Sequence, residues 1–150
     1  MITRSTRCSL VTLFACVTLL TGCAGNGSRD AKTPTLEGTT WHLTQAGGPE
    51  AMEPVPDNMT ITLKITEDQA VSGSAGCNTY RSSCTLNGQS IRFAPIAMTK
   101  KMCPDPPDVM VWERRFVTAL AESTLYQLDG AMLQLQGREG ATLQFGPASE

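Results

Sequence analysis

Four sulfur-bearing side chains lie close together in the sequence: Met98, Met102, Cys103 and Met110. Thioethers and a thiol are the donors that Cu(I) prefers, so this cluster is a candidate soft-metal site. Methionines at such spacing more often fill gaps in a hydrophobic core, and a disulfide at Cys103 would remove the best ligand. We therefore predict no metal site and no cofactor.

Few other side chains are arranged for catalysis. The single histidine, His42, stands beside Trp41 in an alternating segment, and no Gly-x-Ser-x-Gly elbow accompanies it. Asp and Glu residues are spread thinly through expected loops, so no carboxylate pair is placed for glycosidic acid–base work. The sequence predicts a protein that is not an enzyme and has no catalytic residues.

Basic side chains flank the methionines and continue onto the segment that follows. The candidate binding rim comprises Met98, Lys100, Lys101, Met102, Arg114 and Arg115. Such a rim around an apolar mouth suits an anionic lipid head group or an acidic partner surface. The alternative interpretation is a solvated loop and helix face, because surface charges rarely need a functional explanation.

The N-terminal segment predicts where the protein resides. Arg4 and Arg7 precede an almost unbroken apolar stretch at residues 8–20, which is shorter than the roughly 20 residues of a transmembrane helix. The four residues LTGC that end at Cys23 resemble the lipobox of bacterial lipoproteins, in which this cysteine is acylated. Ala24 stands where an Asp would favour retention in the inner membrane, so the resemblance implies a periplasm-facing, palmitate-anchored protein of the outer membrane.

The chain therefore divides into four expected parts: a signal peptide at 1–22, the acylated cysteine and a flexible tether at 23–35, one domain at 36–146, and a tail at 147–150. Without Arg4 and Arg7, 10 Lys and Arg remain against 14 Asp and Glu, a net charge of about −4. This balance, with no basic stripe of interleaved aromatics, argues against nucleic acid as a partner.

The sequence of the domain predicts short strands and one helix. Apolar alternation predicts strands at 40–44, 58–65, 69–74, 81–86 and 90–93, then at 124–128, 131–136 and 141–145. Val109, Trp112, Phe116 and Leu120 form the stripe of a helix that ends near Ser123, with Asp105 as the expected cap. Residues 45–57 form an expected mobile loop. Tight turns leave no room for parallel crossovers, which favours a mainly β fold with a small antiparallel barrel-like sheet and one helix before the last three strands.

Four motifs in order resemble the META-domain family of HslJ-like bacterial lipoproteins. They are GTTW at 38–41, SGSAGCNTY at 72–80, IAMTKKMC at 96–103 and LQF at 143–145. The resemblance implies a partly open barrel with one helix, a role in heat stress and antibiotic tolerance at the envelope, and no established catalytic activity. Cys84 departs from the family pattern.

Cysteine pairing follows from this division of the chain. Cys8 and Cys16 leave with the signal peptide and Cys23 is acylated, so three cysteines remain. Chain entropy gives roughly 3.5 kcal/mol for one pairing, Cys77 with Cys103, and about 2.5 kcal/mol for Cys77 with Cys84, which does not decide between them. The resemblance implies the Cys77–Cys103 disulfide, leaving Cys84 as a small buried free thiol.

The expected function is binding. We expect an anchored, non-enzymatic envelope protein that binds another envelope protein or a membrane component. One alternative is a carrier of a lipid or other hydrophobic small molecule, because small barrels can hold one ligand. A second alternative is a thiol redox protein, although the spacing C-x-x-C is missing.

Overall fold

A computed structural model describes residues 34–148. The predicted signal peptide, Cys23 and nearly all of the tether lie outside the described residues. Within them, no helix has the length and apolar character that crossing a bilayer requires. The domain described below is the compact unit to which these residues belong.

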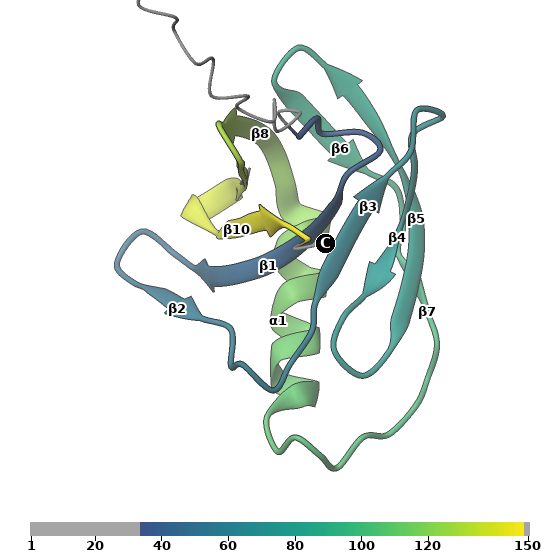
Figure 1. Cartoon of the computed structure of the whole chain (residues 1–150), viewed down its shortest axis with the longest axis vertical. Helices are drawn as coiled ribbons and strands as arrows, with labels where there is room; N and C mark the ends of the chain where they lie inside the picture. Colours follow the sequence, from purple (N-terminus) through teal and green to yellow (C-terminus); the bar gives the residue numbers. More distant parts are fainter. Residues whose placement is uncertain (1–33, 149–150) are drawn as a thin grey trace, which may run out of the picture. The chain divides into compact units, whose positions relative to one another are not determined.

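Ten strands and one α-helix make up the domain (Figure 1). The elements before the helix are β1 (Thr40–Gly47), β2 (Met52–Pro54), β3 (Thr62–Ile65), β4 (Ala70–Ser74), β5 (Thr79–Asn87), β6 (Ser90–Phe93) and β7 (Ala97–Met98). The helix α1 (Val109–Glu122) is followed by β8 (Ser123–Asp129), β9 (Met132–Gly137), a short 3-10 turn η1 (Arg138–Gly140) and β10 (Thr142–Pro147).

Eight of the strands form a closed antiparallel barrel. Neighbouring strands pair in the order β10-β9-β8-β6-β5-β4-β3-β1, and β1 pairs with β10 to complete the ring. This confirms the predicted mainly β class and the place of the helix before the last three strands. The barrel is closed, whereas the resemblance implied a partly open one, because β1 pairs with both β3 and β10.

Alternating apolar residues fill the barrel. Leu63 and Ile65 of β3 and Trp41 and Leu43 of β1 point inward and are almost fully buried, while the intervening Lys64 is exposed. The predicted alternation is confirmed because a strand turns successive side chains to opposite faces. Met59, expected on the same face, is only half-buried.

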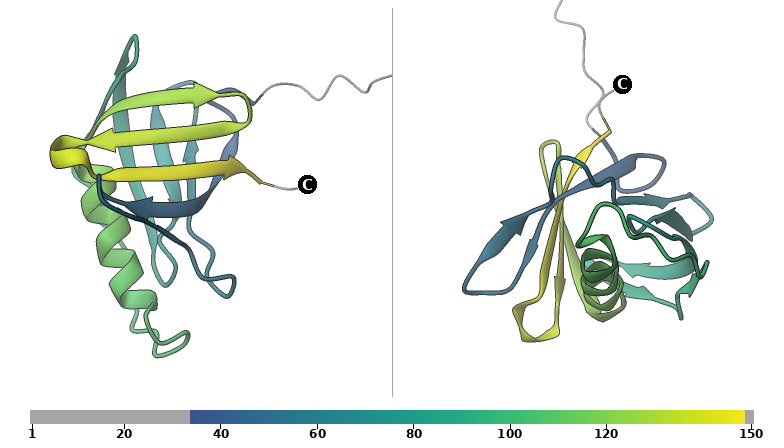
Figure 2. Two further views of the ribbon diagram at one scale, coloured as in Figure 1. Left: turned by 90° about the vertical axis from the view of Figure 1, so that its left-hand side faces the viewer. Right: turned by 90° about the horizontal axis from the view of Figure 1, so that it is seen from below.

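The helix also contributes side chains to the core. All four residues of its predicted apolar stripe are buried, and Phe116 lies between the rings of Tyr80 on β5 and Phe145 on β10, with centroids 5.6 and 6.5 Å away. Figure 2 shows α1 between β8–β10 on one side and the β3–β5 wall on the other. Aromatic contacts to both walls therefore fix the helix inside the fold.

Three local predictions are corrected. The helix begins after Asp108, not after a cap at Asp105, and no side chain caps its first turn. The segment 45–57, expected as a mobile loop, contains the end of β1 and all of β2, which pair with each other. Finally, β10 runs one residue into the expected tail, since Pro147 pairs with Trp41.

Candidate functional site

A buried polar cluster joins the β4–β5 turn to the helix. Asn78 and Glu113 are only 3% and 7% exposed. The backbone N–H of Asn78 donates to Glu113 Oε2 at 2.7 Å, and its side-chain N–H donates to Glu113 Oε1 at 2.9 Å. Because burying a carboxylate without partners is costly, these two bonds account for how the helix tolerates it there.

Asn78 also holds the loop that precedes the helix. Its Oδ1 accepts from the Lys101 backbone N–H and from the Thr99 hydroxyl, each at 2.7 Å, and its Nδ2 donates to the Lys101 carbonyl at 3.2 Å. One carboxamide therefore ties three segments together: its own turn, the loop, and α1. We call the cluster of Asn78, Thr99, Lys101 and Glu113 the asparagine lock.

Two glycines shape the turn that carries the lock. A Cβ at Gly73 would come within 2.0 Å of the Thr62 carbonyl oxygen, so only glycine allows β4 to approach β3 at this point. Gly76 has a φ of +108°, a conformation that side-chain-bearing residues rarely adopt. The motif SGSAGCNTY thus has a structural role, including a hydrogen bond from the Tyr80 hydroxyl to the Thr62 carbonyl at 2.8 Å.

A disulfide reinforces the same connection. Cys77, next to Asn78, is bonded to Cys103, with their Cα atoms 5.9 Å apart. Cys84 is a free and buried cysteine on β5. Burial raises the pKa of the Cys84 thiol above its ordinary value, and the nearby Glu37 carboxylate raises it further. Such a thiol is a weak nucleophile, because the thiolate is the reactive form.

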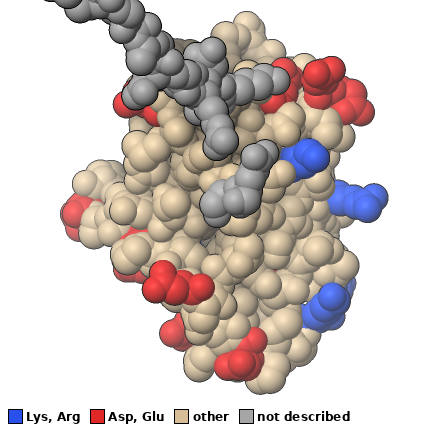
Figure 3. Space-filling model, in the orientation of Figure 1, with Lys and Arg blue, Asp and Glu red and all other residues tan. Residues whose placement is uncertain are grey.

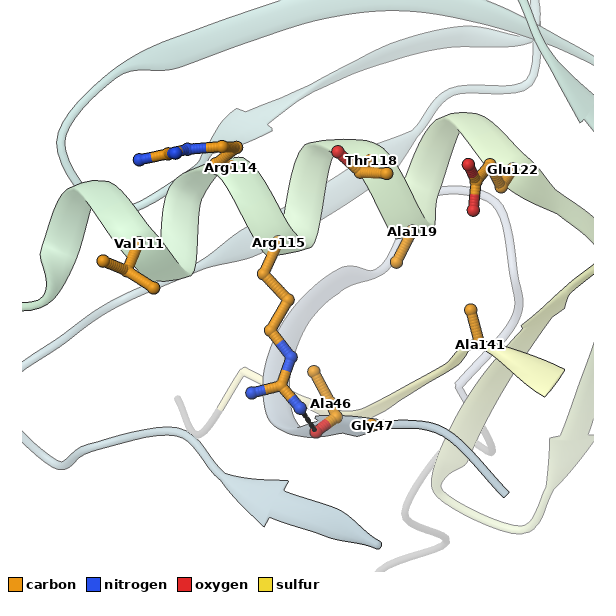
Figure 4. Close-up of a pocket in the computed structure, with 9 residues that line it drawn as sticks. All are labelled: Ala46, Gly47, Val111, Arg114, Arg115, Thr118, Ala119, Glu122 and Ala141. Carbon is orange, nitrogen blue, oxygen red and sulfur yellow. Dashed lines mark hydrogen bonds between the residues drawn. The ribbon is translucent and has the colours of Figure 1, made fainter. Parts of the chain in front are cut away.

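One hollow lies beside α1, on the side of β1 (Figure 4). It has a volume of about 460 Å³ and opens between the helix, the end of β1 and the residue before β10. Small residues form much of its lining, namely Ala46, Gly47, Ala119 and Ala141, and the other lining residues are Val111, Arg114, Arg115, Thr118 and Glu122. The alanines could not be predicted as site residues from the sequence, because small side chains carry no functional group that marks them.

Two further hollows border the other side of the helix. One, of about 310 Å³, is lined by Met98, Met110, Glu113, Arg114, Val117 and Thr118. The other, of about 480 Å³, is lined by Asn78, Ile96, Met98, Thr99, Lys100, Lys101, Met102, Met110 and Glu113. Because Arg114 and Thr118 line the hollows on both sides of the helix, they form a ridge between two grooves.

The structure brings together only part of the candidate rim. Met98, Lys100, Lys101 and Met102 line one hollow, and Arg114 borders the next. Arg115 lies apart from the lysines and methionines.

The Arg115 side chain is held by contacts on the β1–β2 side of α1. Its guanidinium donates to the Ala46 carbonyl at 2.9 Å, forms an ion pair with Glu53 and lies 5.1 Å from the Trp112 ring centroid. Arg115 therefore attaches β2 to the helix and is not part of the rim.

Other candidate sites are not assembled in the described part of the chain. His42 is half-buried on β1 and lines none of the three hollows beside α1. Residues 34–148 contain no group of three or more His, Cys, Asp or Glu side chains placed to hold a metal ion. On the face shown in Figure 3, Lys and Arg lie along one flank and Asp and Glu are spread around the margin.

The fold and the asparagine lock define a small closed barrel with one helix packed against it and a loop held in place before that helix. The sequence model of the META domain matches residues 34–150. The chain therefore belongs to the META domain family, which confirms the resemblance drawn from the motifs. No curated protein matches the sequence.

Solved structures share this fold. A protein from Burkholderia xenovorans determined by NMR is 26% identical, with a TM-score of 0.64 over 77% of this chain and 85% of that one. A second NMR structure is 21% identical, with a TM-score of 0.58 over 75% and 94% of the two chains. A DUF4847 family protein from Bacteroides vulgatus is 18% identical, with a TM-score of 0.54 over 77% and 96%.

Proposed function

We propose that this META domain is a non-catalytic binding module, lipid-anchored through Cys23 to the outer membrane and facing the periplasm. It supports tolerance of envelope stress or antibiotics by binding an envelope protein or a membrane component. The anchor rests on the LTGC sequence, the short apolar segment before it and the polar tether after it. Membership of the family supports the domain assignment.

The observation that carries the binding role is the double groove along α1. Hollows of about 460 and 310 Å³ lie on either side of the ridge formed by Arg114 and Thr118. Val111, near the start of the helix, lines the larger of these two hollows and is 57% exposed, so it offers apolar surface there. Concave apolar surfaces with a few polar groups at their rims are typical of ligand and partner sites.

The rigidity of the surroundings supports the same role. The asparagine lock and the Cys77–Cys103 disulfide fix the loop against the helix, so the groove walls are already in place before a partner arrives. A preformed site loses less conformational entropy on binding than a flexible one. The Arg115 contacts fix the opposite wall in the same way.

The carrier alternative uses the same hollows. Trp41, Phe116 and Phe145 fill the barrel interior and are completely buried. A hydrophobic ligand would therefore sit beside α1 and not inside the ring. The redox alternative has less support, since Cys84 is a buried thiol with a raised pKa.

Crosslinking tests the groove. A photo-activated side chain placed at Thr118, on the ridge, should capture one recurring envelope protein or lipid in living cells. The same group at Thr85, an exposed threonine on β5, is the matched control and should capture neither. Ala119→Leu, which fills the hollow of about 460 Å³, should abolish both the crosslink and the stress tolerance, whereas Thr85→Leu should preserve them. Equal crosslinking at both positions would contradict a site at α1.

Two measurements separate the remaining parts of the proposal. Palmitate should label the wild-type chain and should not label Cys23→Ser. An unlabelled wild-type protein would contradict the proposed lipid anchor. Native mass spectrometry of the purified protein should detect a bound lipid that Ala119→Leu loses if the carrier alternative holds. A protein crosslink with no lipid mass favours partner binding.

A further inference from the structure

We propose that Met98, Met102 and Met110 form a binding site for a soft monovalent cation, Cu(I) or Ag(I), in the hollow before α1. This inference does not depend on the proposed function. All three methionines line the same hollow, although Met98 ends β7, Met102 lies in the β7–α1 loop and Met110 lies in the first turn of the helix. Thioether sulfur is the side-chain donor that selects Cu(I), and it stays available in an oxidising compartment where thiols form disulfides.

The spacing of the methionines predicted a core role and no metal site, but only Met98 packs against the core, and Met102 and Met110 do not. Met102 is 87% exposed, the highest value among the large hydrophobic side chains that are exposed in the described region. Met98 and Met110 are half-buried and line two hollows each, so part of each side chain borders open space. Their three rotatable bonds allow the sulfurs to turn toward a common ion at little cost.

The asparagine lock holds both ligand segments. Asn78 bonds Thr99 and Lys101, which lie between Met98 and Met102 in sequence, and so fixes the loop. It also bonds both carboxylate oxygens of Glu113, which lies less than one helical turn after Met110. The loop and the helix therefore keep a constant separation, as a site with ligands from two segments requires.

Glu113 supplies a negative charge beside the sulfurs. Glu113 lines the same hollow and is only 7% exposed. In residues 34–148 the one ion pair joins Arg115 and Glu53, so no cationic side chain pairs with Glu113 there. A buried carboxylate without a cationic partner favours a cation close by. Cys103 contributes no thiolate, because its sulfur is bonded to Cys77.

Lys100 and Lys101 also line the hollow and oppose a cation. Both are exposed, and long lysine side chains can extend their charge into water. The two lysines therefore allow a test of whether the hollow binds a cation or an anion. Lys100→Gln with Lys101→Gln should tighten binding of a cation, whereas the same change would weaken binding of an anionic ligand at the predicted rim.

Silver provides the direct probe, because Ag(I) mimics Cu(I) and needs no reductant that could open the disulfide. The full chain, with Cys8, Cys16 and Cys23 replaced by serine so that their sulfur atoms do not compete for silver, is labelled at the methionine methyl carbons. It is titrated with silver nitrate in chloride-free buffer and followed by NMR. One equivalent should saturate the shifts of Met98, Met102 and Met110. Met52, Met59 and Met132 serve as internal controls and should not move, although Met132 is 46% exposed.

Leucine substitutions supply the matched variants, since Met and Leu have similar volumes and the exchange usually preserves the fold. Met98→Leu combined with Met110→Leu should weaken Ag(I) binding by about tenfold or more, while Met132→Leu should leave it unchanged. Cys84→Ala should also leave it unchanged, because Cys84 lines none of the hollows beside α1.

Three results would overturn the proposal. Equal shifts at Met102 and Met132 would indicate that exposure alone decides where silver binds. Loss of binding in Cys84→Ala would indicate a thiol site. Weaker binding after removal of the two lysine charges would indicate a site for an anion. None of these results bears on partner capture at Thr118, so failure here leaves the proposed function to its own test.

Discussion

Replacing Asn78 should test whether one carboxamide holds the loop and the helix together. Its side chain makes four hydrogen bonds, three to loop groups of Thr99 and Lys101 and one to the buried carboxylate of Glu113. Each loop group regains water when the side chain is removed, so each bond contributes about 1 kcal/mol net, while the bond to the carboxylate contributes about 1.5–3 kcal/mol. We therefore expect Asn78→Ala to lower the free energy of unfolding by about 4.5–6 kcal/mol.

The isosteric change Asn78→Asp sharpens the test. It keeps the size of the side chain but places a carboxylate oxygen where an N–H donated to Glu113 at 2.9 Å. Two carboxylates then face each other in a buried place, so this variant should be at least as unstable as Asn78→Ala. Adding Glu113→Gln removes the repulsion, and the double variant should recover about 2 kcal/mol relative to the sum of the single changes.

Urea unfolding with the disulfide intact measures these differences. The buried Trp41 and Trp112 provide a fluorescence signal for the folded state. Asn58→Ala, at an exposed position, is the control and should change stability by no more than about 0.5 kcal/mol. The reasoning fails if Asn78→Ala stays within about 1 kcal/mol of the wild type, or if Asn78→Asp shows no coupling to Glu113→Gln.

Four further changes probe other parts of the domain. Removing the Cys77–Cys103 bridge with two alanines should cost roughly 3.5 kcal/mol in urea unfolding, since it closes a loop of sequence separation 26, and an unchanged midpoint would contradict this. Phe116→Ala should cost about 3–5 kcal/mol by calorimetry, because the ring is fully buried between two walls. Arg115→Ala should cost about 1–2 kcal/mol and speed amide hydrogen exchange in β2, which its contacts attach to the helix. The Cys84 thiol has a raised pKa in the folded protein, so its contribution to the free energy of unfolding is complete below the ordinary thiol pKa and is lost as pH rises through the raised value. In unfolding measured at alkaline pH, the wild type should therefore lose stability relative to Cys84→Ala. Parallel pH profiles of the two proteins would contradict the raised pKa.

Sequence patterns predicted the regular elements well because those patterns are local. A strand that buries one face shows alternation, as Leu63 and Ile65 do, and a helix that buries one stripe shows spacings of three and four, as Trp112, Phe116 and Leu120 do. Very short strands carry no such signal. The three residues of β2 and the two of β7 became strands only because β1 and β5 offered them hydrogen-bond partners.

The candidate site was predicted less completely. The rim grouped Arg114 with Arg115, but adjacent residues on a helix point about 100° apart. Both line the hollow beside β1, and only Arg114 also lines the hollow that Met98 and Met110 border. Asn78 and Glu113 gave no signal as a pair because 35 residues separate them. The glycines and the cysteine beside Asn78 marked the turn without revealing what the turn holds.

The sequence alone determined the β-rich class, the single helix and the family. The periodic spacing of apolar residues, the turn residues and the four ordered motifs each involve residues that are close together in the sequence. Only the tertiary structure decided which distant side chains meet. It closed the barrel through β1 and β10, placed Asn78 against Glu113, and gathered three methionines in one hollow. The physical reason is that a buried polar group or a shared hollow depends on contacts across the fold, and no local pattern encodes them.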